Sequence, residues 1–211
     1  GGFGEEAQQL LLTRREGECP IRPSEQKERA ARITAMSYLR DCQDKEQRME
    51  KQLLNTGEYI LLRGKDSYNG LLQRIETNPV SRITGRAIMD LYNSVPKSYR
   101  KNAVFLMNTV TLNELSRSLG VDRNLLSSRD DGTFMLMDHP IVLCNAMPFI
   151  SKGSVPILFG DFGKVSIEDC GRDELQQEPC EGNPGTQQYT LTGYMDCMLE
   201  EQLAIRGIKI V

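Results

Sequence analysis

Few side chains in this 211-residue sequence could carry nucleophilic chemistry. The sequence has one histidine, His139, so almost every Ser-His or Cys-His scheme must use it. His139 stands between Asp138 and Pro140 at the start of an expected strand, where a structural or surface role is the simpler interpretation. A cysteine hydrolase built on Cys144 or Cys42 has no positive support in the pattern. We therefore predict no catalytic residue.

Metal binding is also poorly supported by the residue pattern. The six cysteines are scattered without a C-x-x-C pair, whereas structural zinc is normally held by ligands paired at short spacing. Free thiols in a reducing cytoplasm are the simpler interpretation. We predict no metal site and no cofactor. The cysteines are Cys19, Cys42, Cys144, Cys170, Cys180 and Cys197.

Neither a phosphate-binding loop nor a carboxylate pair is recognisable. The segment 160–163 (GDFG) lacks the glycine spacing of a dinucleotide fingerprint and the terminal Gly-Lys-Ser/Thr of a P-loop. We expect a strand that ends in a tight glycine turn there, with Phe159 and Phe162 packed inward. The adjacent acids at 130–131 and 200–201 would diverge in a strand or loop, which does not form a shared general acid and base.

Composition and charge describe a soluble chain without a membrane anchor. Apolar residues make up 39% of the sequence, and no apolar run approaches the about 18 residues that a membrane span requires. No export leader opens the sequence. The net charge of −3 predicts no overall attraction to nucleic acid. Nine acids against Arg172 alone between 165 and 202 indicate either a solvated acidic face or a surface that avoids tight phosphate pairing.

The elements that would position these residues begin after an expected arm or linker at 1–23. From Ser24 to about Thr56 there is no Pro or Gly, and a partly apolar stripe predicts one helix, with Gly57 placed to end it. About 30 helical residues would span on the order of 45 Å, so this helix must act as a strut. A coiled coil is the alternative, but Asp41 and Asp44 interrupt its apolar positions.

Short strands and capped helices are expected in the rest of the sequence. Turns around one or two short strands fill 59–80, and Thr84 caps a helix that Pro96 stops. A strand at 103–107 precedes a helix that begins with a Thr111-Glu114 capping box. We expect an exposed loop at 121–132, strands at 134–137, 141–144 and 155–159, a mobile connection at 178–186 and a last strand at 208–211. Propensity favours a helix at 196–204.

Four ordered pieces of the sequence resemble the major capsid proteins of tailed bacteriophages (Caudovirales-type). The first is an arginine-asparagine strand with Tyr99, Arg100, Asn102, Ala103, Val104, Met107 and Asn108. The second is a threonine-opened helix from Thr111 to Leu115, the third is a Pro-aliphatic strand that ends in Met147-Pro148, and the fourth is FGDFG at 159–163.

The resemblance implies an α+β phage major-capsid-protein fold in two parts. A peripheral domain would comprise 24–83 and 176–211, with a long strut helix and long antiparallel strands. An axial α/β domain would comprise 84–175. For 189–205 the resemblance implies a long strand rather than a helix, and we adopt the strand. In the family, the strut helix is followed by a glycine-containing segment, for which Asn69-Gly70 is the candidate here.

The implied function is structural rather than enzymatic. The chain would be a subunit of an icosahedral phage or prophage head, assembling into hexamers and pentamers around DNA in the bacterial host cytoplasm and residing in the virion. Its partners would be copies of itself, with scaffold and portal proteins as further candidates and without sequence-specific nucleic-acid binding or a membrane. The loop at 121–132 would meet its copies around the local symmetry axes.

Two alternatives remain open from the sequence. One is a soluble α+β enzyme or ligand-binding domain that shares only the strand-helix motif. The other is the shell subunit of a protein-storage compartment, which would have the same fold. Family members also carry an N-terminal arm and an extended two-stranded loop that clasp neighbouring subunits, and residues 1–23 show no alternating pattern for that loop. We therefore expect the given chain to form monomers or small oligomers.

Overall fold

A computed structural model of the protein describes residues 13–15, 31–39, 45–65, 68–119, 125–172, 175–181 and 186–211. Two compact units divide the chain. The first unit comprises Gly1–Thr13, Leu72–Ser166 and Leu199–Val211, and the second comprises Arg14–Leu71 and Ile167–Met198. The chain therefore passes between the units inside the short helix α4 (Leu71–Arg74) and inside the strands β1 (Thr13–Arg15), β9 (Val165–Arg172) and β11 (Gln187–Leu199).

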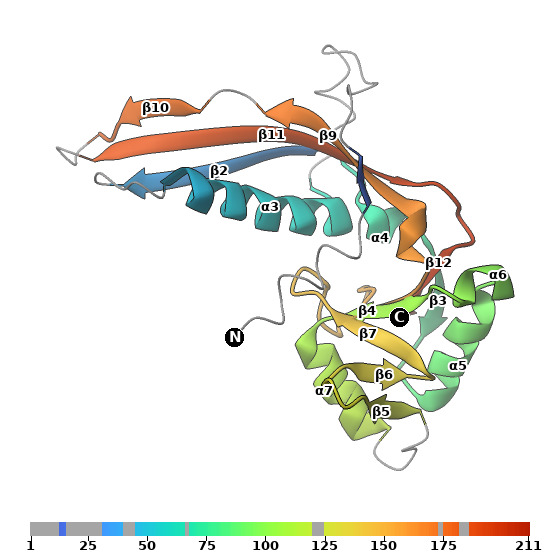
Figure 1. Ribbon diagram of the computed structural model, residues 1–211. Helices are drawn as coiled ribbons and strands as arrows, with labels where there is room; N and C mark the ends of the chain where they lie inside the picture. The colour runs from blue at the N-terminus through green and yellow to red at the C-terminus, as the bar shows by residue number, and fades with distance from the viewer. Residues whose placement is uncertain are drawn as a thin grey trace. The chain divides into compact units, whose positions relative to one another are not determined.

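The first unit is built on a seven-stranded mixed sheet with the order β3-β12-β8-β4-β7-β6-β5 (Figure 1). Central strand β8 pairs antiparallel with both β12 and β4, while β4 and β7 run parallel. The strands are β3 (Glu76–Val80), β4 (Val104–Met107), β5 (Leu126–Ser128), β6 (Phe134–Leu136), β7 (His139–Leu143), β8 (Ile157–Gly160) and β12 (Ile205–Ile210).

Both ends of this sheet are poor templates for a further strand. Strand β3 lies at one end and contains Pro79, which has no backbone N–H to donate. At the other end, β5 has only three residues. Short edge strands and prolines at the edge are the usual means of preventing edge-to-edge pairing.

The helices of the first unit share one apolar core with the sheet. They are α5 (Gly85–Ser94), α6 (Lys97–Arg100), α7 (Thr109–Ser118) and the 3-10 helix Phe162–Lys164. Leu91 from α5 and Leu115 from α7 belong to the same buried cluster as Phe105 and Phe159. The rings of Phe105 and Phe159 stack with centroids 4.3 Å apart, which fixes neighbouring strands β4 and β8 against each other.

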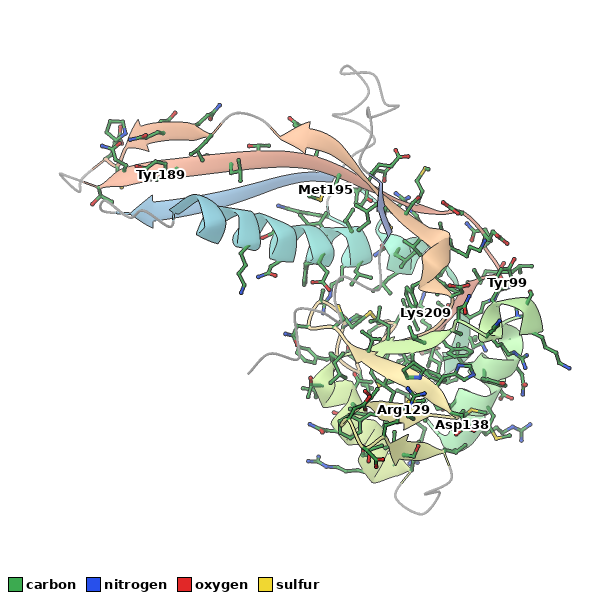
Figure 2. The ribbon with its side chains drawn as sticks, in the orientation of Figure 1. Tyr99, Arg129, Asp138, Tyr189, Met195 and Lys209 are labelled. Atoms are coloured by element: carbon green, nitrogen blue, oxygen red, sulfur yellow. The ribbon has the colours of Figure 1, made fainter. Side chains whose placement is uncertain are left out.

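The second unit combines long antiparallel strands with one long helix, α3 (Lys45–Arg63). Strands β1 (Thr13–Arg15), β9, β11 and β10 (Gln176–Pro179) are neighbours in that order, and β2 (Ala31–Leu39) also pairs with β11. The β2 register runs from Gln187↔Leu39 to Met195↔Ala31, and α3 packs along β2 (Figure 1). Figure 2 labels Tyr189 and Met195 on β11, and both side chains are buried.

The predicted helix from Ser24 to Thr56 is wrong over 31–39 and confirmed over 45–56. The structure has strand β2 at 31–39 and begins α3 only at Lys45. Alternation in ARITAMSYL and pairing with β11 override the helical stripe, a common outcome when tertiary contacts compete with weak propensities. The helix also continues through Gly57 and ends at Gly64, whose φ of 77° suits glycine. Residues 1–12, 16–30 and 40–44 lie outside the described part of the chain.

Two predicted details near α7 are also wrong. Asn108, not Thr111, caps this helix: its side-chain oxygen accepts a hydrogen bond from the Thr111 N–H at 2.7 Å. Tyr99 and Arg100 lie in α6 rather than in a strand, because the strand begins only at Val104. The expected loop at 121–132 contains β5, although 120–124 lie outside the described residues.

Most of the expected strands are confirmed, and so is the Thr84 cap. The Thr84 hydroxyl accepts from the Ala87 N–H, and α5 ends before Pro96 as predicted. The long strand chosen for 189–205 is confirmed as β11 at 187–199, followed by a turn and β12. Part of the expected connection at 178–186 belongs to β10 instead. No helix in the described residues is long and apolar enough to cross a membrane.

Candidate functional site

His139 is a packing residue of the sheet in this structure. Its Nδ1 lies 3.1 Å from the Ala103 carbonyl oxygen, and because a carbonyl only accepts, Nδ1 carries the proton in this contact. The ring also packs against Tyr92 and Phe159, with centroid distances of 5.6 and 5.2 Å. These contacts use the imidazole to join β7 to the residue before β4.

Two of the three cysteines whose side chains the structure describes are buried. Cys144 is 1% exposed in the loop after β7, Cys197 is buried in β11, and Cys180 is partly exposed. None of these three forms a disulfide within the described part of the chain. Cys42 lies outside the described residues. Among the side chains that the structure describes, no three His, Cys, Asp or Glu residues gather closely enough to hold a metal ion.

The GDFG segment forms the tight glycine turn that the sequence predicts. Phe159 and Phe162 are buried, as expected. The Asp161 carboxylate accepts a hydrogen bond from the Gly163 N–H at 3.0 Å and thereby caps the 3-10 helix. That amide is therefore engaged by a carboxylate of the chain itself rather than presented to a phosphate.

The adjacent acids at 130–131 and at 200–201 lie in two different turns of the structure. Asp131 belongs to the β5–β6 turn, where its carboxylate accepts from the Thr133 N–H at 2.9 Å. This hydrogen bond lowers the pKa of Asp131. Glu201 lies instead in the turn between β11 and β12, as part of a cluster with Lys164 and Tyr99. Asp131 and Glu201 therefore make separate structural contacts.

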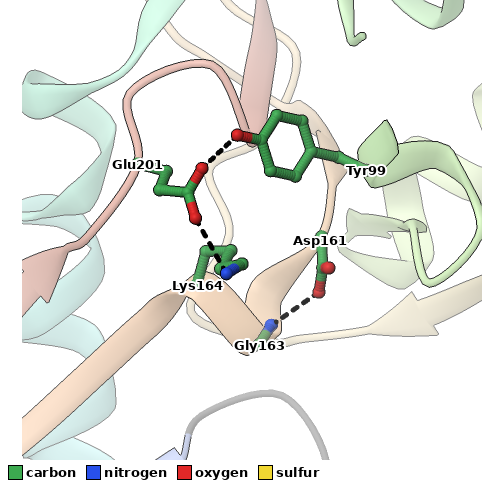
Figure 3. Close-up of polar contacts among 5 residues, drawn as sticks. All are labelled: Tyr99, Asp161, Gly163, Lys164 and Glu201. Carbon is green, nitrogen blue, oxygen red and sulfur yellow. Dashed lines mark hydrogen bonds and ion pairs between the residues drawn. The ribbon is translucent and has the colours of Figure 1, made fainter. Parts of the chain in front are cut away.

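The cluster of Tyr99, Lys164 and Glu201 connects three separate segments of the first unit (Figure 3). Lys164 Nζ lies 2.8 Å from Glu201 Oε1, and the Tyr99 hydroxyl donates to Glu201 Oε2. The hydrogen bond from Lys164, and then that from Tyr99, lower the pKa of Glu201. The bond to Glu201 raises the pKa of Lys164 and that of Tyr99. Sequence inspection missed this cluster because its members are distant along the chain.

Asn108 connects the ends of strands β4 and β7 to the loop that follows β7. It is 3% exposed, and besides capping α7 its amide nitrogen donates to the carbonyl oxygens of Met147 at 3.0 Å and Pro148 at 2.9 Å. All the hydrogen-bonding capacity that such a buried amide needs is thus supplied by backbone groups. The sequence resemblance includes Asn108 but gives no indication of this bridge.

Arg100 stabilises the end of α5 from within the same chain. Its Nε donates to the Val95 carbonyl at 2.7 Å, its Nη2 donates to the Asn93 carbonyl at 3.1 Å, and its guanidinium lies 4.4 Å from the Tyr92 ring centroid. The sequence left open whether Arg100 touches a neighbouring subunit or flanks a strand, and these contacts give it an intrachain role.

Replacing Arg100 by lysine should lower the free energy of unfolding by about 1 kcal/mol, because lysine cannot reproduce the planar two-donor contact. The control is Arg86→Lys, since exposed Arg86 makes only a 3.9 Å pair with Asp90. Urea unfolding followed by circular dichroism measures both variants. Equal stabilities for the two would show that the Arg100 contacts contribute nothing measurable.

Comparison with known families connects this structure to a function. Residues 47–206 match the model of the phage capsid family. The chain belongs to this family. Its role is that of a structural subunit of a phage head, located in the virion capsid. A search of curated proteins finds no match.

Solved structures of capsid subunits share the fold of this family member. The capsid of the native GTA particle is 18% identical with a TM-score of 0.64, and the match covers 86% of this chain and 73% of that one. The holo-SrpI encapsulin complex from Synechococcus elongatus PCC 7942 is 13% identical, with a TM-score of 0.66 over 96% and 86%. The structure of Gordonia phage Cozz is 11% identical with a TM-score of 0.56, and the match covers 94% of this chain and 79% of that one. The α+β capsid fold is therefore confirmed.

The capsid subunit exposes large apolar side chains around the Asn108 bridge. Val110 is the second residue of α7, Leu143 pairs in register with Met107, and Phe149 directly follows Pro148. All three are exposed, and Phe149 reaches 60%. We call Val110, Leu143 and Phe149 the Asn108 patch. Exposed apolar residues on neighbouring elements are candidates for a protein interaction surface.

Proposed function

We propose that this capsid subunit assembles into hexamers and pentamers that enclose phage DNA. The observation that carries the proposal is the family match over residues 47–206, together with the capsid fold. Copies of the chain are its main partners, and scaffold and portal proteins are the further partners of such a head. The working surfaces are subunit contacts, so the subunit performs its task without a catalytic step.

The Asn108 patch supports a contact role for the first unit. Its side chains are apolar and exposed, while nearby backbone groups are held by the Asn108 side chain, which donates two hydrogen bonds and accepts one. Rigid apolar anchors contribute most at the centre of protein interfaces, because little conformational entropy is lost when they are covered. We assign this patch to contacts with neighbouring copies.

We further propose that the axial domain corresponds to the seven-stranded sheet and the peripheral domain to α3 with the long strands. The boundaries predicted from the sequence, 84–175 for the axial part and 24–83 with 176–211 for the peripheral part, stay predictions, and this proposal differs from them in placing β3 and β12 in the axial part. In this assignment, the β5–β6 hairpin supplies the axial loop. Its turn is held by hydrogen bonds from Arg129 N to Thr133 O and from Gly132 N to Arg129 O.

A protein-compartment shell is the second candidate, and the encapsulin structure favours it. Its match covers 96% of this chain with a TM-score of 0.66. A compartment and a phage head would differ in contents rather than in subunit fold. Electron microscopy of particles from full-length protein expressed with its genomic neighbours, followed by nuclease-protected DNA and protein analysis, distinguishes the two. Protected DNA supports the phage head, and packaged cargo protein supports the compartment.

Val110→Asp should reduce assembly at least about tenfold, because it places an unpaired charge within an apolar contact. The matched control is Asn113→Asp, which adds the same charge at an exposed polar position of α7. Both variants should retain the circular dichroism spectrum of the wild type. Light scattering and electron microscopy of full-length protein, expressed with its genomic neighbours, measure the yield of large particles. Normal assembly by Val110→Asp would exclude the Asn108 patch from the contacts.

A further inference from the structure

The cluster of Tyr99, Lys164 and Glu201 lies beside two of the points where the chain leaves the first unit. Lys164 directly precedes β9, which passes into the second unit after Ser166. Glu201 follows the end of β11, which comes from the second unit at Leu199. The cluster therefore joins the start of β9 to the end of β11, which are the parts of these two strands that lie in the first unit. We call these two strand ends the strand roots.

Backbone and side-chain contacts hold these strand roots together. The Glu200 N–H donates to the Lys164 carbonyl at 2.9 Å, parallel to the 2.8 Å side-chain pair between Lys164 and Glu201. Tyr99 adds a third point of attachment from α6, through its hydrogen bond to Glu201 (Figure 3). One carboxylate thus receives two donors from two different elements.

We propose that Tyr99, Lys164 and Glu201 form a clamp on the roots of β9 and β11, whose release lets these strands change their twist. This inference rests on the proposed shell function. A closed shell of hexamers and pentamers requires one sequence to meet its neighbours at more than one curvature. Strands that leave the packed first unit are the places where such a difference can be absorbed, because a packed core resists continuous deformation.

The clamp is suited to reversible release. The Lys164 and Glu201 side chains are 35% and 40% exposed, so water replaces their contact at little cost when it opens. Burying the pair would make release far more expensive, because each ion would lose its hydration without its partner. Partial exposure therefore favours a contact that orders the strand roots without fixing them permanently.

The pH dependence of the clamp follows from the groups that face it. These are Tyr99 from α6, Asp161 and Lys164 from the connection between β8 and β9, and Glu200 and Glu201 from the turn after β11. The pKa of Glu201 is lowered on folding, so its contribution is present above the unfolded glutamate pKa and is lost as pH falls through the folded value.

At high pH the dependence of the clamp on pH has the opposite sign. The pKa values of Lys164 and Tyr99 are raised on folding, so their contributions are complete below the unfolded values. They are lost as pH rises through the folded values. The clamp is consequently closed across neutral pH and opens at both extremes.

Hydrogen exchange of the full chain tests the clamp before assembly. In Glu201→Gln and Lys164→Met, exchange of the Glu200 amide should rise at least about fivefold, which corresponds to about 1 kcal/mol of local opening. Lys164→Arg keeps the positive charge opposite Glu201 and should retain most of the wild-type protection of the Glu200 amide. Glu114→Gln is the charge-matched control, because Glu114 is exposed on α7 and takes part in no ion pair among the described residues. Unchanged exchange in Glu201→Gln would overturn the clamp.

Electron microscopy of assembled particles tests the consequence for curvature. Glu201→Gln particles should show a broader distribution of diameters than wild-type particles, whereas Glu114→Gln particles should not. Faster exchange with an unchanged distribution would overturn the role in curvature. If the wild-type chain forms no shell although the Glu200 amide is protected, the shell function fails and the clamp itself survives, so the two failures are distinguishable.

Discussion

Gly160→Ala should destabilise the first unit by about 4 kcal/mol or more, in the range reserved for severe steric changes. A Cβ at Gly160 would lie 2.1 Å from the Ala204 carbonyl oxygen and 2.6 Å from the Ile205 Cα. Both atoms belong to the backbone, so no side-chain rotation relieves the overlap. Since β8 pairs with β4 on one side and β12 on the other, moving the strand would disturb two ladders.

The matched control for this substitution is Gly153→Ala. Gly153 also has a positive φ, 84°, but a Cβ there would meet nothing within 4 Å. Gly153→Ala should lower the free energy of unfolding by only about 1–2 kcal/mol, because alanine must adopt the left-handed conformation. Urea denaturation of both variants separates backbone strain from overlap. Similar losses would show that the sheet accommodates a methyl group at Gly160.

Asn108→Ala should lower the free energy of unfolding by about 3 kcal/mol, because it removes a helix cap and leaves buried carbonyl groups without their donor. The substitution breaks the bonds to Thr111 N, Met147 O and Pro148 O together. Thermal unfolding and urea denaturation should both report this loss of stability.

Two further variants separate the roles of the Asn108 side chain. Asn108→Asp keeps the acceptor for Thr111 but directs carboxylate oxygen at two carbonyls, so it should be at least as destabilising as the cap loss alone. Thr84→Ala removes only the part-buried cap of α5 and should cost about 1 kcal/mol. If Asn108→Ala costs no more than Thr84→Ala, the bridge to the Met147-Pro148 loop is energetically unimportant.

The resemblance was a better guide than propensity for the long C-terminal strand, where long-range pairing decides the structure. Residues 196–199 favour a helix locally, yet they belong to β11, which is stabilised by neighbours far away in the sequence. The same cause explains the error at 31–39, where the partner of β2 lies about 150 residues later in the chain by the Gln187↔Leu39 register. Local patterns do not contain this information.

Capping was predictable where one side chain acts alone and failed where several candidates compete. Thr84 precedes an apolar helical stripe and a proline, and it caps α5 as expected. Around α7, both Asn108 and Thr111 are suitable caps, and the burial of Asn108 against the Met147-Pro148 loop decides between them. The clamp between Lys164 and Glu201 was not predictable, because only the folded sheet brings them together.

The two ends of the seven-stranded sheet have a consequence for fidelity. Pro79 and the three-residue strand β5 discourage one subunit from adding its backbone to the sheet of another. Backbone pairing is indifferent to side-chain identity and hard to reverse. At these two ends of the sheet, contacts between copies would therefore be made through side chains, which can dissociate after a misplaced encounter and form again.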